Sequence, residues 1–219
     1  MMRPLNNRLD GLYIITPLLA AAEESGYRAT EKKWQTQVQD AISGGASVLQ
    51  FRDKSKDHQN RLAIASWLLA LCHANNIPLI INDDVVLAKK IHADGVHLGR
   101  HDMSVKQARS LLGAEAIIGV SCYNRISLAI SAQIAGADYV AFGRFFPSAT
   151  KPDAVQAPIS ILSEARKKLP IPIVAIGGIT VENASTVIQA GATSISVIDA
   201  VFAQQDTYQA ARNLKNCFG

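Results

Sequence analysis

The sequence predicts a closed (β/α)₈ TIM barrel, and three observations carry this prediction. Short apolar runs are followed eight times by segments compatible with helices. The runs are continuously apolar, as expected for parallel strands covered on both faces. The chain has 219 residues, 48% of them hydrophobic, which suffices for one sizeable core and makes a second full domain unexpected. We therefore expect a single compact domain over residues 1–219, with a loose N-terminal end at 1–10, in preference to an open doubly wound sheet.

The expected strands follow one another in a regular order along the chain. They lie at 11–16, 48–51, 79–82, 96–98, 117–120, 139–142, 173–176 and 195–198. Four of them come just after a glycine suited to the left-handed position at a helix end, namely Gly45, Gly95, Gly136 and Gly191. The stretch from Leu18 to Gln35 is expected to form a lengthened first loop and helix. Function in such barrels lies at the carboxyl ends of the strands, so candidate residues are sought there.

The charge balance and the beginning of the chain exclude several classes of protein. A net charge of +4, from 22 Lys and Arg against 18 Asp and Glu, is too small to indicate nucleic-acid binding and fits a basic pocket for small anions. No stretch reaches the roughly 18 to 20 apolar residues that cross a bilayer. The apolar run 11–22 loosely resembles a secretory signal, but Asp10 adjoins it, Pro17 interrupts it, and its β-branched content favours a buried strand.

The cysteines indicate the compartment. Cys72, Cys122 and Cys217 are widely spaced and form no CxxC pair, so they are expected to be reduced thiols in the cytoplasm. We expect no nucleic-acid or membrane partner. A homodimer is compatible with the mixed helical exterior.

The end of the second strand carries two cations and an amide. Gln50, Arg52 and Lys54 stand two residues apart and therefore share one face of an extended segment. Pointed at the barrel mouth, they could hold a diphosphate, for which the arginine fork is suited. The alternative is a solvated strand exit with ordinary surface charges.

Carboxylates follow the third and fourth strands. Asp83 and Asp84 come directly after one, and Asp102 follows the next, so Asp83 and Asp102 could face a single Mg²⁺ ion. The alternative is helix capping, by Asp83 or Asp84 before the helix expected over 85–91, and by Asp102 before the helix beginning near Ser104.

The fifth strand ends at Ser121, which we interpret as a hydrogen-bonding group and not a nucleophile, because no GxSxG or comparable signature is present. Cys122 is expected to be a buried structural thiol. Glycines interrupt the histidines at 92, 97 and 101, which argues against a helical zinc site. His97 is expected within a strand, and His101 in a loop close to the site.

The last three strand exits suggest anion binding. Ser148, Thr150 and Lys151 form a candidate anion-binding loop within a candidate lid over 144–156. Glycine after the seventh strand and backbone amides after the eighth occupy the usual phosphate position of this fold. The carboxylate of Asp199 would repel a phosphate unless it points aside.

At these positions the sequence resembles the thiamine phosphate synthase (thiamine-phosphate pyrophosphorylase) family over nearly the whole chain. The matching segments are QFRDK at 50–54, INDD at 81–84, GVHLGRHD at 95–102, GVS at 119–121, SATK at 148–151, AIGGI at 175–179 and ISVIDA at 195–200. Seven ordered motifs at strand exits are far more specific than any one of them. Three departures stand out: Ser148 where threonine is common, Arg100 and His101 where glutamine and an acid are common, and Asp199 where serine is common.

The resemblance implies an Mg²⁺-dependent transferase that joins 4-amino-2-methyl-5-hydroxymethylpyrimidine diphosphate to 4-methyl-5-(2-hydroxyethyl)thiazole phosphate, giving thiamine phosphate and pyrophosphate through a carbocation-like step. By similarity, Gln50, Arg52, Lys54, Asn82, Ser121 and Lys151 would bind the pyrimidine diphosphate, with Arg52, Lys54, Ser121 and Lys151 acting in catalysis. Phe51 and Asp53, within the same motif, would belong to the substrate-binding residues. Asp83 and Asp102 would hold Mg²⁺. Ser148, Ala149, Thr150, Gly178, Ile198 and Asp199 would bind the thiazole phosphate.

Other functions remain open from the sequence. A thiazole tautomerase of the same fold family would not need the cations and carboxylates at 52, 54, 83, 102 and 151. A non-catalytic thiamine phosphate binding protein would keep the site without turnover. A phosphosugar isomerase would need a positioned acid and base, and the acids here are better placed for a metal ion.

Overall fold

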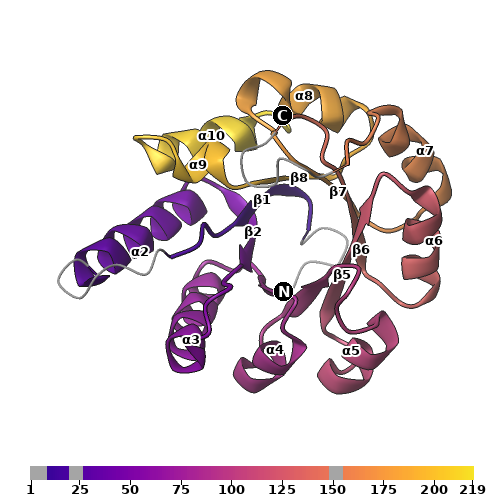
Figure 1. Ribbon diagram of the computed structural model, residues 1–219. Helices are drawn as coiled ribbons and strands as arrows, with labels where there is room; N and C mark the ends of the chain where they lie inside the picture. The colour runs from indigo at the N-terminus through magenta and orange to yellow at the C-terminus, as the bar shows by residue number, and fades with distance from the viewer. Residues whose placement is uncertain (1–8, 20–26, 148–154) are drawn as a thin grey trace.

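The strands form a closed parallel barrel. The computed structural model describes residues 9–19, 27–147 and 155–219. Eight strands are hydrogen-bonded in chain order, and the last pairs with the first. They are β1 (Gly11–Ile15), β2 (Ala46–Phe51), β3 (Leu79–Asn82), β4 (Gly95–Leu98), β5 (Ile117–Tyr123), β6 (Tyr139–Phe142), β7 (Ile173–Ile176) and β8 (Ser194–Val197). The predicted TIM barrel is confirmed, and Figure 1 shows its strands at the centre with helices outside.

Each strand is followed by a helix. The helices are α2 (Tyr27–Ser43), α3 (His58–Ala74), α4 (Val85–Ile91), α5 (Val105–Leu112), α6 (Ile126–Ile134), α7 (Ser160–Lys168), α8 (Val181–Gln189), α9 (Asp199–Phe202) and α10 (Thr207–Asn216). Side-chain caps fix several of their starts: Asp57 begins α3, Asp84 begins α4, and Ser104 forms a capping box with Gln107 at α5. In the described residues, no helix is long and apolar enough to cross a membrane.

Three predicted strands, 79–82, 139–142 and 173–176, have the observed bounds, while β5 continues beyond its predicted end to Tyr123. One glycine has a different role from the predicted one. Gly45, Gly136 and Gly191 have positive φ as expected, but the left-handed residue after α4 is His92, at φ 57°. Gly95 lies inside β4, where a Cβ atom would come within 2.0 Å of the Ile117 carbonyl oxygen. Close strand packing therefore requires glycine at position 95.

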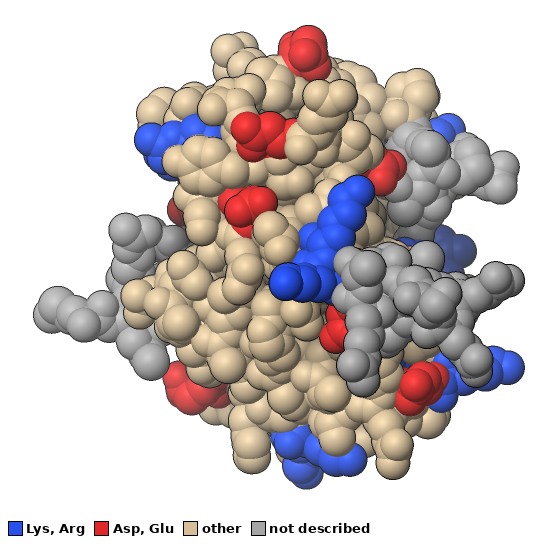
Figure 2. Space-filling model, turned by 90° about the vertical axis from the view of Figure 1, so that its left-hand side faces the viewer, with Lys and Arg blue, Asp and Glu red and all other residues tan. Residues whose placement is uncertain are grey.

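The apolar side chains form two layers. The larger layer fills the space between the barrel and the helices. The smaller one fills the barrel and comprises Leu9, Tyr13, Ile15, Val48, Ile80, Ile117, Tyr139, Ala141 and Val174. Leu9 is fully buried in this interior, so the loose end expected over 1–10 does not extend to it. On the face seen in Figure 2, basic and acidic side chains are interspersed among neutral ones.

Candidate active site

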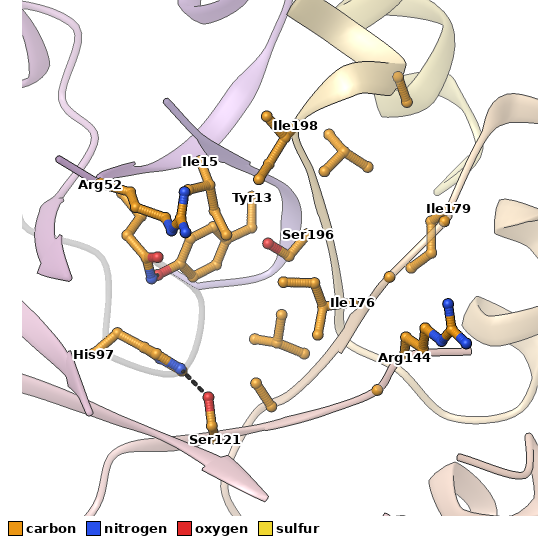
Figure 3. Close-up of a pocket in the computed structure, with 18 of the residues that line it drawn as sticks. Tyr13, Ile15, Arg52, His97, Ser121, Arg144, Ile176, Ile179, Ser196 and Ile198 are labelled. Carbon is orange, nitrogen blue, oxygen red and sulfur yellow. Dashed lines mark hydrogen bonds between the residues drawn. The ribbon is translucent and has the colours of Figure 1, made fainter. Parts of the chain in front are cut away.

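A cavity opens at the carboxyl ends of the strands. Its volume is about 390 Å³, within the range of small-molecule sites, and residues from all eight strands or the loops that follow them line it. Figure 3 shows Ile15, Ile176, Ile198 and Tyr13 around the cavity, with Arg52 on one side. The cavity therefore joins an apolar wall, suited to a flat ring, to polar groups that can fix its orientation.

At the end of β2, neighbouring side chains of the segment 50–54 point in opposite directions, so only some of them face the cavity. Gln50 and Arg52 line the cavity, whereas Phe51 is buried in the layer between barrel and helices. The carboxylate of Asp53 accepts hydrogen bonds from the Ser55 backbone N–H (2.7 Å) and hydroxyl (3.0 Å). The side chains of Phe51 and Asp53 are thus outside the main cavity, because a strand sends neighbouring residues to opposite faces.

The two cations after β2 have different surroundings. The Arg52 guanidinium forms no ion pair with any carboxylate of the described residues, and the Arg52 backbone N–H is held by the Thr16 hydroxyl at 3.0 Å. The Lys54 ammonium, by contrast, forms an ion pair with Asp83, which directly follows β3. Of these two cations, Arg52 is the one whose charge is not paired with a described carboxylate, and Lys54 connects the loop after β2 to Asp83.

The three aspartates after β3 and β4 divide their roles. Asp84 caps α4 by accepting from the Leu87 N–H at 2.9 Å and pairs with Arg61 at 2.9 Å. Asp83 has a positive φ of 63°, which turns its carboxylate away from the helix start and toward Lys54. Asp102 accepts a hydrogen bond from the Gly99 N–H at 2.6 Å, and Ser104, not Asp102, caps α5. Capping therefore accounts for Asp84 but not for Asp83 or Asp102.

The carboxyl groups of Asp83 and Asp102 interact directly, and their pKa values move in opposite directions. Burial alone would raise the pKa of Asp83, but hydrogen bonding and attraction from Lys54 lower it below its ordinary value. Burial and the neighbouring Asp83 charge raise the pKa of Asp102, against the Gly99 hydrogen bond. Two carboxylates held this close repel each other, so a cation placed between them would be stabilised.

A second hollow of about 460 Å³ adjoins these acids and is lined by Asn82, Asp83, Asp102, Lys54 and Asp53, among others. Within the described ranges, no group of three or more His, Cys, Asp or Glu side chains is arranged to hold a metal ion. A pair of carboxylates is nevertheless the protein share of many Mg²⁺ sites, in which waters and substrate phosphates complete the coordination. The donor chemistry of Asp83 and Asp102 thus suits Mg²⁺ and not a closed zinc centre.

Ser121 faces the cavity from β5, and its Oγ lies 2.8 Å from His97 Nε2, the contact dashed in Figure 3. His97 lies within β4, as predicted. Tyr13, Tyr139 and Ser196 also line the cavity. Sequence reasoning misses them because residues within buried strands carry no signal that separates them from the core. Ser196 is 3% exposed, and its Oγ is one of two buried side-chain polar atoms in the described residues without a hydrogen-bond partner. In Figure 3 it points into the cavity.

The expected thiazole phosphate residues are described only in part. Ser148, Ala149, Thr150 and Lys151, and most of the candidate lid, lie outside the described residues. Gly178, Ile198 and Asp199 line the cavity. Gly178 has φ 65°, and a Cβ there would lie 2.2 Å from the Pro147 carbonyl oxygen, so glycine lets the loop after β7 touch the loop after β6. Asp199 is the first residue of α9 and is exposed.

The cysteines yield a prediction about reactivity. Burial raises the pKa of Cys122 to about 12, and burial together with Asp94 does the same for Cys72, so both stay protonated thiols near neutral pH. We expect N-ethylmaleimide to label Cys217, which is half-buried, before the other two. Peptide mass mapping after timed labelling checks this order. Rapid labelling of Cys122 in the folded protein would contradict the structural role.

The barrel and its charged mouth define a single-domain TIM-barrel protein whose chemistry lies at the carboxyl ends of the strands. The family model of thiamine monophosphate synthase matches residues 20–201. The chain belongs to this family.

Individual relatives agree with this assignment. A thiamine-phosphate synthase of Nitrosococcus oceani is 54% identical over 178 residues, covering 81% of this chain and 82% of the relative. One of Thioalkalivibrio sulfidiphilus is 46% identical over 217 residues, covering 99% of both. The solved structure of a thiamine phosphate pyrophosphorylase from Pyrococcus furiosus has a TM-score of 0.83 at 31% identity and covers 98% of both chains.

Proposed function

We propose that the protein joins the pyrimidine diphosphate to the thiazole phosphate and releases pyrophosphate, forming thiamine phosphate. One observation carries the proposal beyond family membership: at the ends of β2, β3 and β4, Arg52 lines the cavity, Lys54, Asp83 and Asp102 line the second hollow, and Asn82 lines both. A thiazole tautomerase would have no use for this diphosphate and metal set. The charged edge beside the ring-sized cavity instead suits a substrate with a flat ring and a diphosphate tail.

The residues of the chain support a reaction that needs no protein nucleophile. The bond that breaks joins the pyrimidine methylene carbon to the diphosphate oxygen, and the bond that forms joins this carbon to the thiazole nitrogen. Arg52 and Lys54 are placed to stabilise the negative charge that grows on the departing pyrophosphate. Ile15, Ile176 and Ile198 give the cavity an apolar wall. Such a wall would disfavour water near the reacting carbon and so favour attack by the thiazole over hydrolysis.

We further propose that Asp83 and Asp102 hold Mg²⁺. Their mutual repulsion and the Lys54 ion pair at the same place support a site for positive charge. Mg²⁺, when bound, supplies charge that neutralises diphosphate oxygens. Lys54 would then turn from Asp83 to the diphosphate, and Asn82 would orient the same ligand from the end of β3.

The proposed reaction is tested by incubating the protein with both substrates and Mg²⁺, oxidising the mixture, and measuring thiochrome fluorescence. We expect fluorescence that requires both substrates and Mg²⁺ and disappears when EDTA is added. A folded sample that binds thiamine phosphate but gives no fluorescence would support the non-catalytic alternative. Fluorescence that is insensitive to EDTA would refute the Mg²⁺ proposal alone.

We also infer that the enzyme works in the cytoplasm, because all three cysteines are free thiols and two of them are buried. A homodimer is compatible with its helical exterior. Size-exclusion chromatography with light scattering distinguishes a dimer from the 23.5 kDa monomer.

A further inference from the structure

Five polar side chains form an unbroken hydrogen-bonded chain across the barrel interior. The links are Gln50 Nε2 to Tyr13 OH at 2.7 Å, Tyr13 OH to Tyr139 OH at 2.8 Å, Tyr139 OH to His97 Nδ1 at 2.9 Å, and His97 Nε2 to Ser121 Oγ at 2.8 Å. The two ends, Gln50 and Ser121, line the cavity and are expected to contact the pyrimidine substrate. The three middle residues connect them through the barrel, and we call the whole set the barrel relay.

The strand beside Tyr139 leaves room for its ring. Tyr139 is fully buried, and a Cβ atom on Gly119, in the middle of β5, would lie only 1.9 Å from its Cζ. Glycine inside a strand is destabilising relative to alanine, so this space exists despite a local penalty. A glycine at 119 therefore serves to bring the Tyr139 hydroxyl to the centre of the barrel, where it meets both Tyr13 and His97.

The relay has a direction, because each hydroxyl and the neutral imidazole carries one proton. Gln50 donates its Nε2–H to Tyr13, which leaves Tyr13 to donate to Tyr139. If Tyr139 in turn donates to Nδ1 of His97, the imidazole proton is on Nε2 and is donated to Ser121, at the two contact distances observed. At the two ends, the Gln50 carbonyl oxygen is left as an acceptor for the cavity, and the Ser121 hydroxyl is left as a donor.

The opposite direction presents the opposite pattern. If Ser121 donated to His97, the protons would run back to Gln50, whose oxygen would accept and whose NH₂ would face the cavity. Burial raises the pKa of Tyr13 and Tyr139 well above the ordinary value, so both phenols keep their protons and the relay stays intact at either direction. The state of one end therefore determines the state of the other.

We propose that Tyr139 and His97 are positioning residues that hold the relay in the first direction and so select a 4-aminopyrimidine. An exocyclic amino group needs an acceptor such as the Gln50 oxygen, and a ring nitrogen or diphosphate oxygen needs a donor such as the Ser121 hydroxyl. This inference rests on the proposed function, because it assumes that the pyrimidine occupies the cavity. A 4-oxopyrimidine, whose oxygen is an acceptor, would face the wrong group at Gln50 and would bind weakly.

The test replaces Tyr139 by phenylalanine, which keeps the ring and removes the hydroxyl. We expect the KM for the pyrimidine diphosphate to rise about tenfold, as for the loss of one or two net hydrogen bonds, with the KM for the thiazole phosphate unchanged. Discrimination against the 4-oxo analogue, measured as a ratio of dissociation constants by calorimetry, should fall about tenfold for the same reason. The ¹⁵N spectrum of His97 should change from the Nε2–H tautomer to a mixture of tautomers.

Two variants complete the test. Gly119→Ala displaces the Tyr139 ring without removing its hydroxyl and should produce the same changes. Tyr208→Phe, on the outer helix α10 where Tyr208 is exposed, removes a hydroxyl far from the relay and should change nothing. The proposal is overturned if Tyr139→Phe retains both the His97 tautomer and the discrimination, or if the KM values of both substrates rise equally together with a loss of Tm. Absence of thiamine phosphate synthesis by the unmodified protein would instead refute the proposed function, and the tautomer measurement would still decide whether Tyr139 sets the direction of the relay.

Discussion

Replacing Arg52 with alanine is expected to lower kcat/KM for the pyrimidine diphosphate by about two to three orders of magnitude. Its guanidinium lines the cavity and pairs with none of the described carboxylates, so its charge is available to the departing pyrophosphate. The charge on the leaving group is greater in the transition state than in the bound substrate. Steady-state kinetics should therefore show that kcat falls by more than KM rises.

Two matched variants separate charge from geometry at this position. Arg52→Lys keeps the charge but loses the bidentate fork, and we expect it to retain intermediate activity. Arg212→Ala removes an exposed arginine of α10 and should leave kinetics unchanged. Because Arg52 has no ion pair with a described residue, its loss should change Tm little. Full activity in Arg52→Ala, or a loss of activity explained by unfolding, would contradict the assigned role.

The barrel could be predicted from the sequence because the signals that define its strands and helices are local. Each strand is a short apolar run, each helix end carries a polar cap or a glycine, and the order of these elements determines which residues reach the mouth. For that reason Gln50, Arg52 and Ser121 could be predicted to reach the cavity, and Asp83 to lie beside it at the end of β3. The alternation of a strand also explains why Phe51 and Asp53, counted with them from the motif alone, have side chains outside the main cavity.

The remainder of the site could not be predicted, because it depends on contacts between strands that are distant in the sequence. Tyr13 and Tyr139 are 126 residues apart, and nothing in either segment shows that their hydroxyls meet. In the sequence, Gly119 is simply one residue of an apolar strand. The structure shows that glycine is needed there because the ring of Tyr139, on β6, lies against it. Asp83 and Asp84 are adjacent residues of the same type, so the sequence alone does not distinguish their roles. Only the backbone dihedral angles show that one caps the helix while the other faces Lys54 and Asp102.

This last distinction gives a prediction with two nearly identical substitutions. Asp83→Asn should raise the Mg²⁺ concentration needed for half-maximal activity by at least about tenfold and lower kcat/KM by about two orders of magnitude. Asparagine tolerates the left-handed φ of 63° and can still accept a hydrogen bond from Lys54, so fold and contacts are kept while one negative charge is lost. Titrating Mg²⁺ in the thiochrome assay measures both effects.

Asp84→Asn is the control one residue away. Asparagine caps helices as well as aspartate does, so α4 keeps its start, and only the partly exposed pair with Arg61 is weakened. Activity and the Mg²⁺ requirement should stay within about threefold of the unmodified protein, because the Asp84 side chain is already engaged by the Leu87 N–H and by Arg61. Asp84→Ala should instead lower stability by about 1 kcal/mol through the lost cap, again with a normal Mg²⁺ response. If the two asparagine variants shifted the Mg²⁺ titration equally, net charge at the barrel mouth would explain the effect and the specific site at Asp83 would have to be abandoned.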